Sequence, residues 1–86
     1  MPIRILIVDD SAAIRQAARS CIESNTKLEI CGEAENGVVA LDMLRKVNPD
    51  VLVLDLAMPG MNELAAAQEI KASAPGARVV VFTRTI

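Results

Sequence analysis

The sequence contains no histidine, tryptophan or tyrosine, and Phe82 is its only aromatic residue. Without histidine, the chain cannot build a histidine metal site, use histidine as a general base or carry a phosphohistidine. One aromatic ring is too few for a base-stacking platform or an aromatic cage. These absences exclude several common classes of metal, acid–base and nucleic-acid chemistry.

Cysteine, long apolar runs and excess positive charge are also scarce. There are two cysteines, Cys21 and Cys31, and no secretory signal precedes the first predicted strand, so we expect small core or edge residues rather than a disulfide. No apolar run reaches the ~18 residues that a membrane span needs. The net charge is −2, with Lys and Arg scattered. We therefore expect a cytoplasmic protein with no membrane segment and no direct nucleic-acid binding.

The length of 86 residues predicts a single domain, residues 1–86, and a hydrophobic content of 52% is typical of a globular core. Three short apolar runs at 51–54, at 79–82 and at 3–8, where Arg4 is the one charged residue, predict buried strands. Residues 28–33 instead alternate, with Leu28, Ile30 and Gly32 on one side and Glu29, Cys31 and Glu33 on the other. This half-polar pattern predicts an edge strand.

Apolar residues at helical spacing predict a helix in each interval between strands. The first follows a cap at Asp10 or Ser11, and the others lie between residues 37 and 48 and between residues 62 and 75. Strands that alternate with helices predict an α/β fold with a doubly wound parallel sheet. Because the half-polar strand belongs at an edge, the predicted strand order is 2-1-3-4.

Acidic and hydroxyl residues follow the buried strands. Asp9 and Asp10 come after the first, Asp55 after the third and Thr83 after the fourth. The carboxyl ends of parallel strands share one sheet edge, where open α/β sheets place their sites. Crowded carboxylates need a cation, and oxygen ligands alone favour Mg²⁺ or Mn²⁺. A carboxylate beside such an ion can act as a nucleophile towards a phosphoryl group.

Each of these residues alone is commonly a helix cap or a turn residue, so the prediction depends on their joint occurrence. Together with the surrounding sequence, they resemble the receiver domain of bacterial two-component response regulators. The resemblance covers the whole chain and is carried by ILIVDDS (5–11), GEAENG (32–37), VLDLAMPGM (53–61) and VVFT (80–83).

The resemblance implies a flavodoxin-like fold and a role for each site residue. Asp55 would accept a phosphoryl group from a sensor histidine kinase. Mg²⁺ would be held by Asp9, Asp10, Asp55 and the backbone carbonyl of Ala57, and Thr83 would be the switch hydroxyl. The sequences of two segments, Gly32–Gly37 and Met58–Met61, are similar to those of receivers attached to helix-turn-helix transcription factors. DNA would then be contacted only through an output domain outside this sequence.

Two departures from the family pattern affect these expectations. The family has five strands, whereas this sequence stops after the fourth, and the lysine that follows the family's fifth strand has no counterpart. Lys27, Lys46 and Lys71 fall elsewhere, and Arg84 is not assigned the lysine's role. Glu63 stands where the family usually has glycine. We therefore expect an incomplete receiver of four strands and three helices, with inefficient phosphorylation.

Three functions remain open from the sequence. The first is a phosphoacceptor module rather than an enzyme. The second is a non-switching receiver remnant that acts in oligomerisation, through an exposed fourth strand at Val79–Phe82. The third is a phosphohydrolase with an Asp nucleophile, which typically needs a second acid two residues further on. Ala57 occupies that position, which disfavours this function.

Overall fold

The structure of the chain, a computed structural model, describes residues 2–55 and 63–82, without the side chains of residues 55, 63–67, 81 and 82. Strands and helices alternate in the order β1 (Ile3–Val8), α1 (Ala12–Glu23), β2 (Leu28–Ala34), α2 (Gly37–Val47), β3 (Val51–Asp55), α3 (Glu63–Ser73) and β4 (Arg78–Phe82). The strands form one parallel sheet in the order β2-β1-β3-β4. The predicted α/β class and strand order are confirmed.

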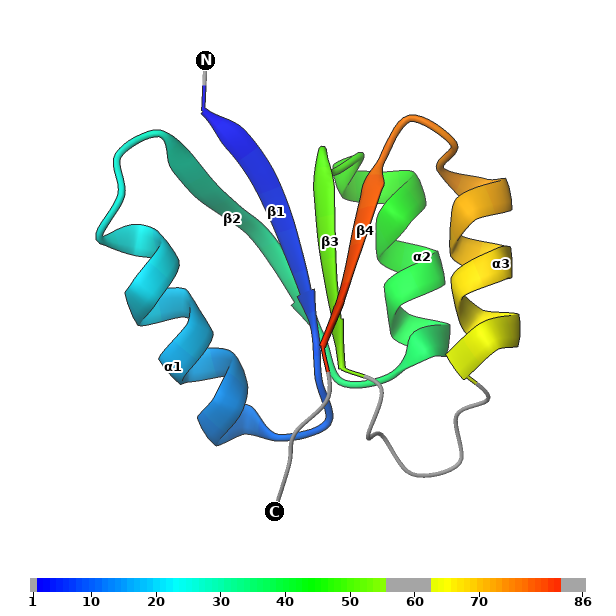
Figure 1. Ribbon diagram of the computed structural model, residues 1–86, viewed down its shortest axis with the longest axis horizontal. Helices are drawn as coiled ribbons and strands as arrows, with labels where there is room; N and C mark the ends of the chain where they lie inside the picture. Colours follow the sequence, from blue (N-terminus) through cyan, green and yellow to red (C-terminus); the bar gives the residue numbers. More distant parts are fainter. Residues whose placement is uncertain (1, 56–62, 83–86) are drawn as a thin grey trace.

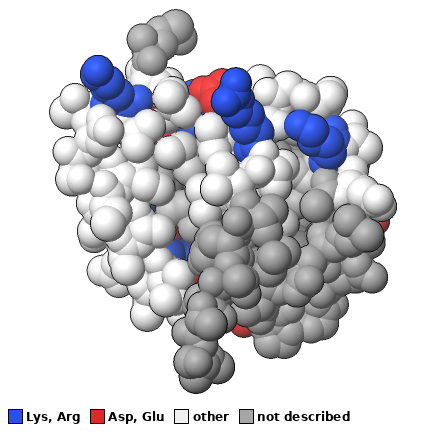
Figure 2. All heavy atoms as spheres, in the orientation of Figure 1, with Lys and Arg blue, Asp and Glu red and all other residues white. Residues whose placement is uncertain are grey.

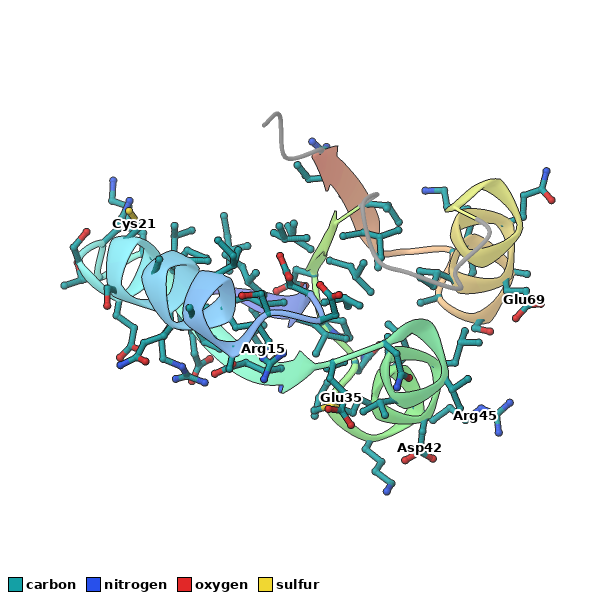
Figure 3. All side chains as sticks on the ribbon, turned by 90° about the horizontal axis from the view of Figure 1, so that it is seen from below. Arg15, Cys21, Glu35, Asp42, Arg45 and Glu69 are labelled. Carbon is teal, nitrogen blue, oxygen red and sulfur yellow. The ribbon has the colours of Figure 1, made fainter. Side chains whose placement is uncertain are left out.

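The helices cover the two faces of the sheet unequally. Helix α1 lies over one face beside β1 and β2, whereas α2 and α3 lie on the opposite face (Figures 1 and 3). The main core lies under α2 and α3, where the inward side chains of the central strands meet those of the helices; it comprises Leu6, Val8, Ala34, Ala40, Leu44, Leu52, Leu54 and Ile70. This core fixes the central strands, and therefore the sheet edge at which they end.

Short polar side chains set the helix boundaries. Ser11 caps α1, since its Oγ accepts a hydrogen bond from the backbone N of Ile14 at 3.3 Å. Of the two predicted caps, Ser11 is thus the one used. Asn36 caps α2 by accepting from the backbone N of Val39 at 2.9 Å. Asn48 ends α2 in the left-handed conformation, with φ of 46°, as is common where Asn replaces the usual Gly.

The edge strand β2 contains a β-bulge that the sequence pattern did not predict. Its register with β1 passes from Ile5 opposite Ile30 to Leu6 opposite Gly32, so Cys31 is an extra residue. The Cys31 thiol donates to the backbone carbonyl of Ile5 at 3.3 Å. The predicted edge position is confirmed, but the predicted regular alternation is wrong beyond Ile30. The extra residue turns Glu33 to the α1 face.

The two cysteines are free and differ in exposure. Cys21 was expected in the core or at an edge, but it is exposed and points away from the sheet (Figure 3). The reason is that α1 turns a narrow stripe towards the sheet, with Ile14, Ala18 and Ile22 only half-buried. Cys31 is half-buried against the core, and this burial raises the pKa of its thiol.

Charge is distributed unevenly along the strand direction. In Figure 2 most of the visible Lys and Arg side chains lie along the upper rim, where the strands of Figure 1 begin. Arg4 and Arg78 lie at strand starts, and Lys27 directly precedes β2. The cationic residues at the strand starts therefore lie at the opposite end of the strands from Asp9.

Within the described residues, no helix has the length and apolar character needed to cross a membrane.

Candidate functional site

The register of the central strands brings two of the predicted acids to one edge. Val8 of β1 pairs with Leu54 of β3, so the residues that follow them, Asp9 and Asp55, end adjacent strands at the same level. Asp55 in turn pairs with Phe82, the residue before Thr83. The side chain of Asp55 and the whole of Ala57 and Thr83 lie outside the described residues, so their roles stay predictions.

Asp9 is fully buried and held by several hydrogen bonds. Its backbone N donates to the carbonyl of Ala34 at 3.0 Å, and its Oδ1 accepts from the backbone N of Ser11 at 2.9 Å. Its backbone carbonyl accepts from Nη1 of Arg15. The end of β1 is thereby attached to β2 on one side and to the start of α1 on the other.

Asp10 is exposed, in contrast to Asp9, and lies in the short loop between β1 and Ser11, the N-cap of α1. The exposed Asp10 carboxylate is accessible to a solvated cation, and the Asp9 carboxylate belongs to the preceding residue of the same loop. Among the described side chains, no group of three or more acidic, Cys or His residues is close enough to hold a metal ion. The predicted third carboxylate, that of Asp55, is not among the side chains described.

An ion-pair network next to Asp9 was not predicted from the sequence. Arg15 Nε donates to Glu33 Oε1 at 3.1 Å, and Arg19 Nε donates to Glu33 Oε2 at 2.7 Å. The hydrogen bond from Arg19 to Glu33 raises the pKa of that guanidinium. The only sequence signal was two arginines four residues apart on a predicted helix. Their partner was hidden, because Glu33 faces α1 only through the bulge.

The lysines are located away from this edge, as expected. Lys46 forms an ion pair with Asp42 on α2 at 3.1 Å. Lys71 Nζ donates to the carbonyl of Ala77, in the turn before β4 begins. Lys27 directly precedes β2, also at the amino ends of the strands. None of these three ammonium groups is placed to contact an anion at the Asp9 edge.

Comparison with known proteins gives consistent matches. The profile of the response regulator receiver domain matches residues 5–86. The chain is 42% identical over 83 residues to the protein-glutamate methylesterase/protein-glutamine glutaminase of Pyrococcus abyssi, which covers 96% of this chain and 23% of that protein. The chain thus spans less than a quarter of that curated relative.

Two solved structures have the same fold and a similar sequence. The response regulator domain of Thermotoga maritima CheB matches with a TM-score of 0.87 and 32% identity, over 96% of this chain and 61% of that one. A two-component response regulator of the LuxR family from Aurantimonas sp. SI85-9A1 matches with a TM-score of 0.89 and 30% identity, over 100% of this chain and 61% of that one.

Proposed function

Because the chain belongs to the receiver domain family of two-component response regulators, we propose that it accepts a phosphoryl group on Asp55 from a sensor histidine kinase, with Mg²⁺ bound beside it. The observation that carries this proposal is the register of β1 with β3. In this register Asp9 directly follows β1, and Asp55 is the last residue of the neighbouring strand β3 at the same edge. Open α/β sheets place their sites at this edge, and acids there can supply both a nucleophile and ligands for a cation.

The residues at this edge fit a hard divalent cation. Their side-chain donors are carboxylate oxygens, which Mg²⁺ prefers, and Asp9 and Asp10 are consecutive on a loop that several hydrogen bonds hold. We assign the ion to Asp9, Asp10, Asp55 and the carbonyl of Ala57. When bound, Mg²⁺ offsets the negative charge of the phosphoryl oxygens. Few protein ligands leave the ion much of its water, so we expect weak affinity.

The chain's own residues then have simple tasks. A carboxylate oxygen of Asp55 attacks phosphorus, while the bond from phosphorus to the kinase histidine breaks and its electron pair returns to the imidazole nitrogen. The product is an aspartyl phosphate. The hydroxyl of Thr83 would donate a hydrogen bond to a phosphate oxygen. Because Lys27, Lys46 and Lys71 all lie away from this edge, no described lysine stabilises the charge of the phosphoryl group, and we expect the transfer to be inefficient. The chain accepts the group and does not turn over a substrate, so we propose a phosphoacceptor rather than an enzyme.

Labelling by acetyl phosphate tests the proposal. Intact-mass spectrometry should show the addition of one phosphoryl group that depends on Mg²⁺ and is absent from Asp55→Asn. The matched control is Asp42→Asn, because Asp42 is an exposed acid on α2 with a side chain 63% exposed. Label that persists in Asp55→Asn would contradict the assignment. Steady turnover of a phosphomonoester would instead favour the phosphohydrolase.

A second candidate function is self-association through β4. Within the described residues β4 lies at one edge of the sheet, and Val80 is 51% exposed there. An apolar edge strand can pair with another chain. Val80→Lys should then shift sedimentation towards the monomer, whereas Val38→Lys, on the exposed surface of α2, should not. A wild-type monomer at high micromolar concentration would exclude this function.

Partners beyond the kinase follow from the relatives and are proposals here. The names of the relatives include a methylesterase/glutaminase and a LuxR-family regulator. A receiver of this type is therefore compatible with more than one output. The sequence-based expectation of a helix-turn-helix output in the cytoplasm is one of these, and phosphorylation of Asp55 would control whichever output is attached.

A further inference from the structure

Arg15 connects three parts of the molecule near the proposed cation site. Its Nη1 donates to the backbone carbonyl of Asp9, and its Nε donates to Glu33 Oε1 at 3.1 Å. The Arg15 side chain is only 18% exposed, so the contacts are partly shielded from water. In Figure 3 Arg15 lies between α1 and the end of β2. The guanidinium therefore spans from the edge strand to the loop that carries the acids.

The carbonyl that Arg15 contacts belongs to the peptide bond between Asp9 and Asp10. Because a peptide unit is planar, the direction of this carbonyl also sets the direction in which the chain enters Asp10. On the other side of Asp10, the backbone N of Ser11 is held by Asp9 Oδ1 at 2.9 Å. The exposed carboxylate of Asp10 thus projects from a backbone that is fixed both before and after it.

We propose that Arg15 is a positioning residue for the cation site, which holds the Asp9–Asp10 peptide so that the Asp10 carboxylate meets the ion in the correct place. The inference rests on the proposed Mg²⁺ site. Arg15 itself would not touch the ion. Groups that orient metal ligands in this way typically change metal affinity by about tenfold or more when removed.

Arg19 provides a matched comparison within the same network. It binds the same carboxylate, with Nη2 2.7 Å from Glu33 Oε2, and also Glu23 at 3.3 Å. In the described structure the Arg19 guanidinium donates to the carboxylates of Glu33 and Glu23, and the Arg19 side chain is 39% exposed. Replacing Arg19 therefore removes a similar positive charge and a similar ion pair with Glu33, while the Arg15 bond to the carbonyl of Asp9 stays.

Charge and positioning predict opposite results for Arg15→Gln. The substitution removes a positive charge and leaves the Glu33 carboxylate, so electrostatics alone would tighten the binding of a cation. Loss of the bond to the Asp9 carbonyl would weaken it. Arg15→Lys separates the two further, because it keeps the charge but loses the planar fork that reaches two acceptors at once. Under positioning, both variants bind Mg²⁺ more weakly.

The experiment is a Mg²⁺ titration of the metal-free protein, followed by the ¹⁵N NMR shifts of Asp10 and Ser11. We expect the Kd for Mg²⁺ to rise about tenfold in Arg15→Gln. It should also rise in Arg15→Lys, and it should change little in Arg19→Gln. Urea unfolding without Mg²⁺ measures the stability of each variant, so that a general loss of folding is recognised. The shift of the Asp10 amide in the metal-free state reports the peptide orientation directly.

Each outcome separates the two proposals. Unchanged or tighter binding in Arg15→Gln would overturn the positioning role while leaving the Mg²⁺ site intact. Equal weakening in Arg19→Gln would also overturn it, since the effect would then belong to the ion-pair network as a whole. A wild-type protein that gives no response at millimolar Mg²⁺ would overturn the cation site itself, and the positioning role with it.

Discussion

Leu6→Ala tests whether the central strand carries the stability of the fold. Leu6 is fully buried in β1, within the core under α2. Replacing a buried leucine by alanine typically lowers the free energy of unfolding by about 2–5 kcal/mol. Leu6 and Met43 both lie against Gly32, since a Cβ added there would be 3.3 Å from Leu6 Cδ1 and would also meet Met43 Cε. The flexible Met43 side chain can partly fill the space, so we expect about 3 kcal/mol.

That loss is large for a domain of this size. At about 0.05–0.15 kcal/mol per residue, the whole chain has a free energy of unfolding of roughly 4–13 kcal/mol. Urea unfolding followed by far-ultraviolet circular dichroism should therefore show a clearly lower midpoint. The control is Val38→Ala, since Val38 is 79% exposed on α2 and should change stability by less than about 0.5 kcal/mol. A loss below about 1 kcal/mol for Leu6→Ala would refute the assigned core.

Four further predictions concern the ends of α2 and the Cys31 thiol. Asn36→Ala removes the acceptor for the backbone N of Val39 and should lower the free energy of unfolding by about 1 kcal/mol in the same urea assay. Asn48→Gly should raise it by up to about 1 kcal/mol, because glycine adopts the φ of 46° without a Cβ penalty. Burial raises the pKa of the Cys31 thiol, so iodoacetamide should modify it more slowly than exposed Cys21. Because the pKa of Cys31 is raised in the folded protein, its contribution to the free energy of unfolding should be fully present below the ordinary thiol pKa and should be lost as pH rises through the raised pKa. The same pH titration of Cys31→Ala should not show this loss.

Most of the fold could be predicted because short apolar runs in the sequence identify the strands. Residues 5–8 of β1 are buried on both faces, Leu52 and Leu54 of β3 are buried in the main core, and the alternation of strand and helix leaves few topologies. The edge position of β2 followed from its polar residues. Its bulge could not be predicted in the same way, because one extra residue changes the register without changing the composition. The exposure of Cys21 was missed since helical periodicity does not tell how much of α1 the sheet covers.

The candidate site was likewise predictable in part: the positions of its acids could be predicted from the sequence, and the contacts around them could not. Asp9, directly after β1, and Asp55, at the end of β3, share one sheet edge because of the strand order, and the strand order could be predicted from the sequence. The contacts around Asp9 were not readable, because they depend on tertiary geometry. Arg15 and Glu33 are 18 residues apart, and nothing in their local sequence favours this pairing over a solvated surface.

The bulge and the site belong to one chain of causes. Cys31 is the extra residue in β2, and its presence puts Glu33 on the α1 face instead of the α2 face. There Glu33 meets Arg15, whose other nitrogen holds the carbonyl of Asp9. Without the bulge Glu33 would face the apolar core under α2, where an unpaired carboxylate is costly. The irregularity in the edge strand therefore removes a charge from the core and uses it to fix the loop on which the proposed phosphoacceptor chemistry depends.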